Sequence, residues 1–193
     1  MFVHADVYDA FTDRLVAGAE DMTIGPGIED PDLGPLVTTE ARDSVASYVE
    51  DAVTGGGRLL TGGSIPRETG AFYEPTVIDQ VDDDAAISCD EVFGPVITLY
   101  EFTDDAEAIR RANDTDYGLY SAVYTQDLDR AHNTAAELEA GTVAVNEFPL
   151  TFPQAPFGGY KKSGIGREKG VQAIDRYSQL KNVAVSLGDS SLA

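Results

Sequence analysis

The hydrophobic pattern of the chain switches repeatedly between a strand period and a helix period. Val7, Phe11 and Leu15 recur at helical spacing after a short apolar segment, and this succession is repeated further along the chain. Strands that alternate with helices of this length are typical of a mostly parallel sheet covered on both faces. The pattern predicts an α/β fold of three layers. The segments with strand composition are residues 2–4, 58–63, 72–81, 95–102, 120–125 and 142–146.

Capping residues and glycines set the expected limits of these elements. The glycines of TGGG, residues 54–57, are expected to end the second helix through a left-handed residue, and Gly141 to end the last one. We expect the strand at 58–63 to be buried, and Pro75 to move the strand at 72–81 to a sheet edge or a bulge. The expected helix N-caps are Asp6, Thr38 or Thr39, and Asp104 or Asp105.

The charge of the chain excludes some classes of function. Its 193 residues carry 13 cations and 34 anions, a net charge of −21, which opposes binding to nucleic acid. A surface so rich in acid favours a protein adapted to high salt, a halophilic interpretation that we hold above ordinary acidity. No apolar run approaches the ~18 residues of a membrane span. The first residues, MFVHADVYDAF, do not have the pattern of a secretory signal peptide, because acids stand where a basic region should lie. We expect a cytoplasmic protein.

Few residues offer metal or thiol chemistry. The chain has one cysteine, Cys89, so an internal disulfide is excluded. His4 and His132 are single histidines without obvious partners, and we interpret them as structural residues rather than ligands or bases. No metal site is expected.

One stretch, from Gln154 to Gly170, differs from the rest of the chain. It contains five glycines in the sequence QAPFGGYKKSGIGREKG, and six of the thirteen cations lie between Phe157 and Lys181. A phosphate-binding loop at GIGREKG would need a hydrophobic strand leading into its first glycine, and FGGYKKS is not one. The alternative is that these residues start a helix covering Glu168 to Tyr177.

Three motifs in this order carry a family resemblance. PFGGYKKSGIGRE, together with EVFGP at Glu91–Pro95 and NDTDYGL at Asn113–Leu119, resembles the aldehyde dehydrogenase superfamily, and the likeness runs from about Phe2 to about Leu187. The resemblance implies an oxidoreductase that converts an aldehyde to a carboxylic acid with NAD or NADP as cofactor. It also implies a catalytic-domain portion at residues 1–178, a strand arm for oligomerisation at 179–187 and a disordered tail at 188–193.

The resemblance assigns roles to four residues. Glu91 corresponds to the glutamate that accepts hydrogen bonds from the ribose hydroxyls beside the nicotinamide. Phe93 corresponds to the aromatic that packs near that ribose, with core filling as the alternative. Asn146 and Phe157 correspond to residues that line the substrate tunnel. Asn146 also ends a predicted strand, and ligands bind at such strand ends in α/β sheets.

The family's nucleophilic cysteine and its general-base glutamate correspond to positions before Met1. Cys89 lies two residues before Glu91, which is not the nucleophile's place, and its acidic neighbours oppose thiolate formation. The sequence thus resembles the last part of an aldehyde dehydrogenase, and we expect no catalytic residue here and no activity from the chain alone. It leaves open the aldehyde and the choice between NAD and NADP.

Two other functions stay open on the sequence. A non-catalytic remnant could associate with a full-length relative through its last strand, or with further copies of itself as a homo-oligomer. A free-standing nucleotide-binding protein could use the glycine-rich stretch. We expect an aldehyde as the small-molecule partner, and neither nucleic acid nor membrane.

Overall fold

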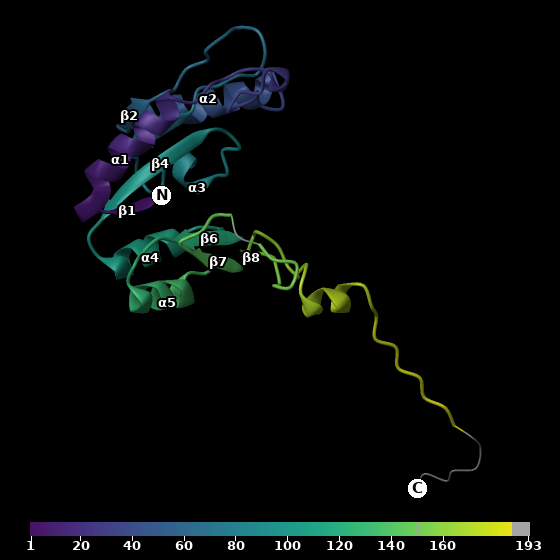
Figure 1. The fold of residues 1–193 in the computed structure, drawn as a ribbon. Coiled ribbons are helices and arrows are strands. Elements are labelled where there is room, and N and C mark those ends of the chain that lie inside the picture. Colours follow the sequence, from purple (N-terminus) through teal and green to yellow (C-terminus); the bar gives the residue numbers. More distant parts are fainter. Residues whose placement is uncertain (150, 187–193) are drawn as a thin grey trace. The chain divides into compact units, whose positions relative to one another are not determined.

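A computed structural model describes residues 1–149 and 151–186 of the chain (Figure 1). The chain divides into two compact units, Met1–Thr115 and Asp116–Ala193. The division falls inside the region 1–178 that the sequence suggested as one catalytic-domain portion, so each unit is described by itself.

The first unit contains a four-stranded sheet in the order β1-β4-β3-β2. Both β1 and β3 run parallel to β4, and β2 is antiparallel to β3, which confirms a mostly parallel sheet. These strands are β1 (Phe2–His4), β2 (Arg58–Thr61), β3 (Thr76–Asp79) and β4 (Val96–Phe102).

Two expectations about these strands were wrong. Pro75 does not place its strand at an edge, because β3 begins one residue later and lies between β4 and β2. The amide of Thr76 already donates to the Pro95 carbonyl at 2.8 Å, so the missing N–H of proline costs the sheet no bond. The edge strand is β2, whose first two residues are exposed.

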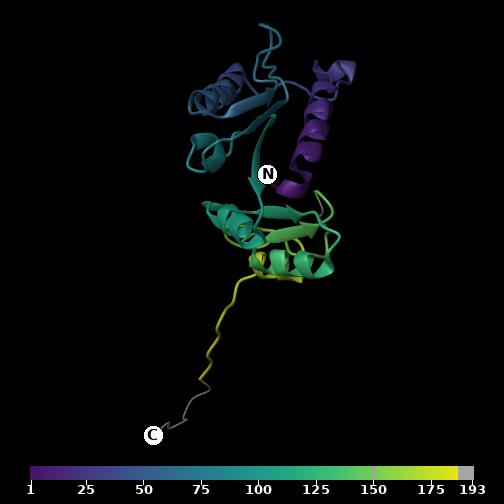
Figure 2. The ribbon, with the colours of Figure 1, turned by 90° about the vertical axis from the view of Figure 1, so that its left-hand side faces the viewer.

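Helices cover both faces of this sheet. Successive residues of β3 point to opposite faces: Val77 packs in a cluster with Leu99 beneath α1, and Ile78 packs with Val45 of α2 and Ile87 of α3. Figure 2 shows α1 on one side of the strands and α2 and α3 on the opposite side. The helices of this unit are α1 (Ala5–Glu20), α2 (Thr39–Thr54), α3 (Ala86–Cys89) and α4 (Asp105–Asn113), with a 3-10 turn at η1 (Gly27–Glu29).

The N-caps of α2 and α4 are among the residues expected from the sequence, and that of α1 is not. Thr38 accepts the amide of Ala41 at 3.1 Å, and Asp104 accepts that of Ala106 at 2.8 Å. Helix α1 is capped by His4 rather than Asp6, because β1 leads directly into it and Asp6 already lies in its first turn. His4 Nδ1 accepts the Asp6 amide at 3.2 Å, which gives this histidine a structural role.

The left-handed glycine expected after α2 is Gly56, with φ of +109°. Gly55, directly after the helix, keeps a right-handed conformation. One residue with a right-handed backbone, Gly55, therefore lies between the end of the helix and the residue with positive φ.

The second unit is built on a strand-helix-strand motif. Strands β6 (Tyr120–Val123) and β7 (Thr142–Val145) pair in parallel and are connected by α5 (Leu128–Glu137). A second pair joins β5 (Tyr117–Gly118) to β8 (Tyr160–Lys161) in antiparallel orientation. The helix expected over Glu168–Tyr177 is a shorter 3-10 segment, η2 (Val171–Arg176), because Lys169 and Gly170 have positive φ.

The last described residues, 179–186, have no assigned strand or helix in the single chain. Pairing of this arm with a sheet of another subunit stays a prediction. Leu187 and the tail 188–193 lie outside the described residues. Among the helices of the described residues, none is long and apolar enough to cross a membrane.

Candidate cofactor and substrate site

The loop that carries Glu91 and Phe93 connects α3 to β4 and is anchored on both sides. Before it, Asp90 accepts a hydrogen bond from the Tyr48 hydroxyl at 3.0 Å. Within it, Val92 packs against the core cluster around α2. After Phe93, a Cβ on Gly94 would lie 2.6 Å from Val45 Cγ2, so only glycine lets the loop approach the helix this closely.

Phe93 is held with an unusual backbone and an open ring. Its φ is +51°, a left-handed conformation that costs a residue with a side chain on the order of 1–3 kcal/mol. The residue is 76% exposed and Glu91 is also exposed, so Phe93 does not fill the core of its unit. Strain of this kind persists where the surrounding structure imposes it, and it is concentrated at binding sites.

These two side chains suit the nicotinamide end of a dinucleotide. A free carboxylate accepts hydrogen bonds from a pair of ribose hydroxyls. An exposed aromatic ring offers an apolar face to a ribose or a nicotinamide ring. The loop therefore has a hydrogen-bond acceptor and an apolar face for that half of the cofactor.

Cys89 does not have the setting of a nucleophile. It is the last residue of the four-residue α3, is exposed, and its Sγ donates to the Asp83 carbonyl at 3.3 Å. Reactive thiols lie at helix N-termini or beside cations, which favour the thiolate. Neither condition holds for this residue.

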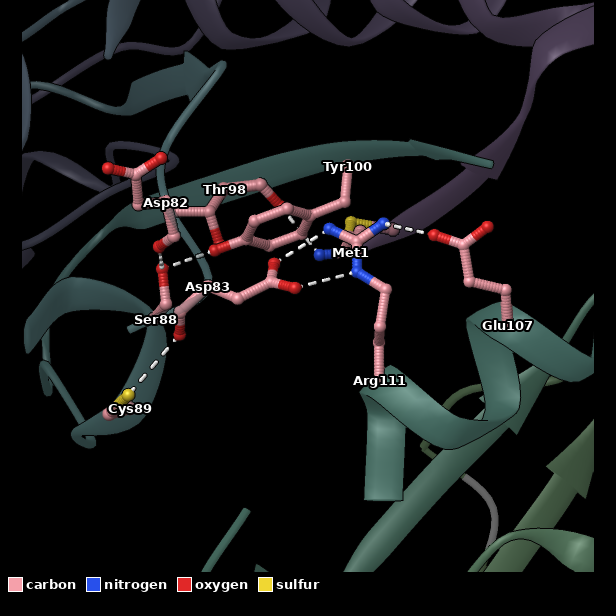
Figure 3. Close-up of polar contacts among 9 residues, drawn as sticks. All are labelled: Met1, Asp82, Asp83, Ser88, Cys89, Thr98, Tyr100, Glu107 and Arg111. Atoms are coloured by element: carbon pink, nitrogen blue, oxygen red, sulfur yellow. Dashed lines mark hydrogen bonds and ion pairs between the residues drawn. The ribbon is translucent and has the colours of Figure 1, made fainter. Parts of the chain in front are cut away.

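A cluster that the sequence pattern did not reveal surrounds Arg111 of α4 (Figure 3). Its Nε and Nη2 donate to the two carboxylate oxygens of Asp83 at 2.8 and 2.7 Å. The guanidinium lies 5.1 Å from the ring centre of Phe2 and 5.3 Å from that of Tyr100. The hydrogen bonds from Arg111 hold the pKa of the Asp83 carboxyl below its ordinary value.

A hydroxyl pair continues this cluster. Ser88 Oγ donates to the Asp82 carbonyl at 2.8 Å and lies 2.5 Å from the Tyr100 hydroxyl. Because serine has one proton to donate, the Tyr100 hydroxyl is the donor to Ser88. Figure 3 shows that these contacts join the turn at 82–89 to β4 and α4.

Asn146 directly follows β7 and is tied to the end of β6. Its Oδ1 accepts the amide of Thr125 and its Nδ2 donates to the carbonyl of the same residue, both at 2.9 Å. Its φ is +57°, which asparagine tolerates better than most residues. The residue is exposed at the carboxyl end of a parallel pair, the usual ligand edge of an α/β sheet.

Phe157 lies in the glycine-rich stretch directly before Gly158, and its side chain is half-buried. Its backbone forms a two-bond bridge with Glu168, at 2.8 and 2.7 Å, and Lys169 Nζ lies 5.3 Å from its ring centre. Arg167 Nη1 donates to the carbonyls of Gly159 and Gly166 at 3.0 and 2.7 Å. The stretch therefore binds its own backbone, which disfavours a phosphate loop.

The four residues fall into two pairs. Glu91 and Phe93 share one loop of the first unit, and Asn146 and Phe157 belong to the second. Gly158, next to Phe157, contacts Gly141 just before β7, and Asn146 just follows that strand. The glycine-rich stretch and Asn146 are thus associated with opposite ends of a strand roughly 13 Å long.

No group of histidine, cysteine, aspartate and glutamate residues within 1–149 and 151–186 is placed to hold a metal ion.

A model of the family described as "Aldehyde dehydrogenase family" matches residues 1–183. The chain belongs to the aldehyde dehydrogenase family. Betaine aldehyde dehydrogenase from Brucella anthropi is 42% identical over 193 residues, which cover 97% of this chain and 40% of that protein. The chain spans about two fifths of the length of the curated relatives it matches.

Solved structures of the family agree with this fold. Aldehyde dehydrogenase from Bacillus cereus in complex with NAD+ superposes with a TM-score of 0.91 at 40% identity, covering 97% of this chain and 38% of that one. Betaine aldehyde dehydrogenase from Staphylococcus aureus in complex with NAD+ gives 0.86 at 40% identity, covering 91% and 36%.

Proposed function

We propose that this chain supplies the nicotinamide-ribose contact and part of the substrate tunnel of an NAD- or NADP-dependent aldehyde dehydrogenase. The observation that carries the proposal is the exposed Phe93, held in a left-handed backbone conformation two residues after the exposed carboxylate of Glu91. Relatives at 40% identity have been solved with NAD+, which supports this cofactor end. The nicotinamide ribose is common to both dinucleotides, so the proposal applies to either.

Each residue has one role in this function. A bound NAD or NADP would supply the hydride acceptor. Glu91 accepts hydrogen bonds from the ribose hydroxyls and so orients the nicotinamide, while Phe93 covers the ribose and excludes water. Asn146 and Phe157 line the path of an aldehyde, whose oxidation yields a carboxylic acid.

The 193-residue chain alone does not oxidise aldehydes under this proposal. Its one thiol, Cys89, ends the short helix α3 and donates to a backbone carbonyl, a contact that does not activate it as a nucleophile. The purified chain, incubated with NAD+ or NADP+ and short aldehydes, should form no NADH or NADPH. Turnover that disappears in Cys89→Ser would show that the assignment of Cys89 is wrong.

A direct binding experiment tests the cofactor contact. Nicotinamide riboside carries the relevant ring and sugar without phosphates, and binding at millimolar concentration should shift the NMR signals of residues 91–94. Phe93→Ala and Glu91→Gln should each weaken the shift. Shifts that are the same in both variants and in the native chain would exclude this loop as the contact.

A second function, as an assembly partner of a full-length relative or of further copies, is favoured by exposed apolar side chains between residues 171 and 185. Light scattering should then show an oligomer, and a chain ending before residue 171 should be monomeric. The exposed apolar side chains are those of Val171, Ile174, Tyr177, Leu180, Val183 and Val185.

We propose the cytoplasm as the compartment of either form, because the lone cysteine permits no internal disulfide.

A further inference from the structure

The turn that precedes Glu91, residues 82–90, is held by three other elements of its unit. Helix α4 contributes Arg111, strand β4 contributes Tyr100 and helix α2 contributes Tyr48. The side chains that these residues bind are spaced along the turn at Asp83, Ser88 and Asp90. A loop of nine residues with three side-chain anchors has little freedom to move, which matters for the residues that follow it.

Arg111 makes the strongest of these contacts. A bidentate pair between guanidinium and carboxylate fixes both position and orientation, which a single hydrogen bond does not. The Arg111 side chain is only 17% exposed and is enclosed by the rings of Phe2 and Tyr100. Glu107, one helical turn away, adds a second carboxylate, with its Oε1 3.8 Å from Nη1. The cation thus has one rotamer, set by two rings and two carboxylates.

We propose that Arg111 is a positioning residue for the cofactor contact. It holds Asp83, and through the turn at 82–90 it sets the backbone from which Glu91 and Phe93 project. Tyr100 acts with it by donating its hydroxyl proton to Ser88 of the same turn (Figure 3). This inference rests on the proposed function for the identity of the ligand, while the mechanical link from Arg111 to residues 91–94 can be measured without any ligand.

The experiment compares three variants of the full chain by amide hydrogen exchange. Arg111→Ala removes the bidentate pair, Arg111→Lys keeps the charge without the fork, and Arg58→Ala breaks the other bidentate pair of the same unit, which joins Arg58 to Asp79 at 2.9 and 2.5 Å. Exchange at 91–94 should rise about tenfold in Arg111→Ala, by less in Arg111→Lys, and no more than elsewhere in Arg58→Ala. Asp83→Asn serves as a second test if Arg111→Ala fails to fold.

The outcomes separate the two levels of the proposal. Equal exchange at 91–94 in Arg111→Ala and Arg58→Ala would show that Arg111 only stabilises the unit, and the positioning role would be wrong. Faster exchange at 91–94 together with weaker nicotinamide riboside shifts in Arg111→Ala supports both levels. If the native chain gives no riboside shifts, the cofactor contact fails, and the exchange data still decide whether Arg111 sets the loop.

Discussion

Gly141 and Gly158 are in backbone contact: a Cβ on Gly141 would lie 1.7 Å from the Gly158 carbonyl oxygen. Gly141 leads into β7, and Gly158 belongs to the glycine-rich stretch after Phe157. The two segments can approach this closely only because Gly141 has no side chain, while a Cβ on Gly158 would lie 2.4 Å from the Gly166 carbonyl oxygen. The glycines of the signature motif therefore serve packing in the second unit.

Gly141→Ala should be strongly destabilising, because the added methyl group collides with backbone that cannot move without breaking the Phe157–Glu168 bridge. We expect a loss of about 3 kcal/mol in the free energy of unfolding, measured by urea denaturation. Gly18→Ala is the matched control, since Gly18 lies in α1 with no atom within 4 Å of the added Cβ. That variant should gain up to about 1 kcal/mol; equal losses in both would contradict the packing role.

Asn146 should respond differently to two small substitutions. Both Asn146→Ala and Asn146→Gly lose the two hydrogen bonds to Thr125. Alanine is also strained at φ of +57°, whereas glycine is not. The alanine variant should therefore be less stable than the glycine variant by roughly 1 kcal/mol. Thermal unfolding of the two proteins side by side measures the difference, and an alanine variant as stable as the glycine variant would argue against the left-handed conformation.

Acid should weaken the Asp83–Arg111 pair. The pKa of Asp83 is lowered in the folded chain, so its stabilisation is present above the carboxyl's ordinary pKa and is lost as the pH falls through the lowered value. Asp83→Asn should be less stable than the native chain at pH 7, and the gap should close below about pH 4. A gap that stays constant between pH 7 and pH 3 would show that the carboxylate charge contributes nothing.

Salt should stabilise the protein. A net charge of −21 on 193 residues produces self-repulsion, which is screened within a few Å at molar ionic strength. The unfolding midpoint should rise from low to multimolar KCl, as expected of a halophilic protein. A midpoint that is flat or falls over this range would leave ordinary acidity as the explanation.

Local signals in the sequence were sufficient where a feature depends on neighbouring residues. Thr38 or Thr39, and Asp104 or Asp105, were expected as N-caps because each pair precedes an apolar helical period, and the caps are Thr38 and Asp104. His4 was missed because β1 and α1 adjoin without a linking residue, which moves the cap to the last residue of the strand. The prediction from Pro75 was wrong because β3 begins at Thr76, one residue after the proline.

Contacts between distant residues could not be read from the pattern. Arg111 and Asp83 are 28 positions apart, and neither belongs to a motif that singles it out. The contact of Gly141 with Gly158 is also a property of packing, although the glycine excess in the second segment gave a hint of it. The resemblance named Glu91, Phe93, Asn146 and Phe157, and their roles stay predictions.

The backbone of Phe93 implies a trade-off between robustness and activity. Glycine at this position would adopt the same conformation without strain, so Phe93→Gly should make the fold more resistant to heat. The phenylalanine ring therefore comes at a cost in stability, which is the usual relation between a binding surface and the resistance of a fold to heat.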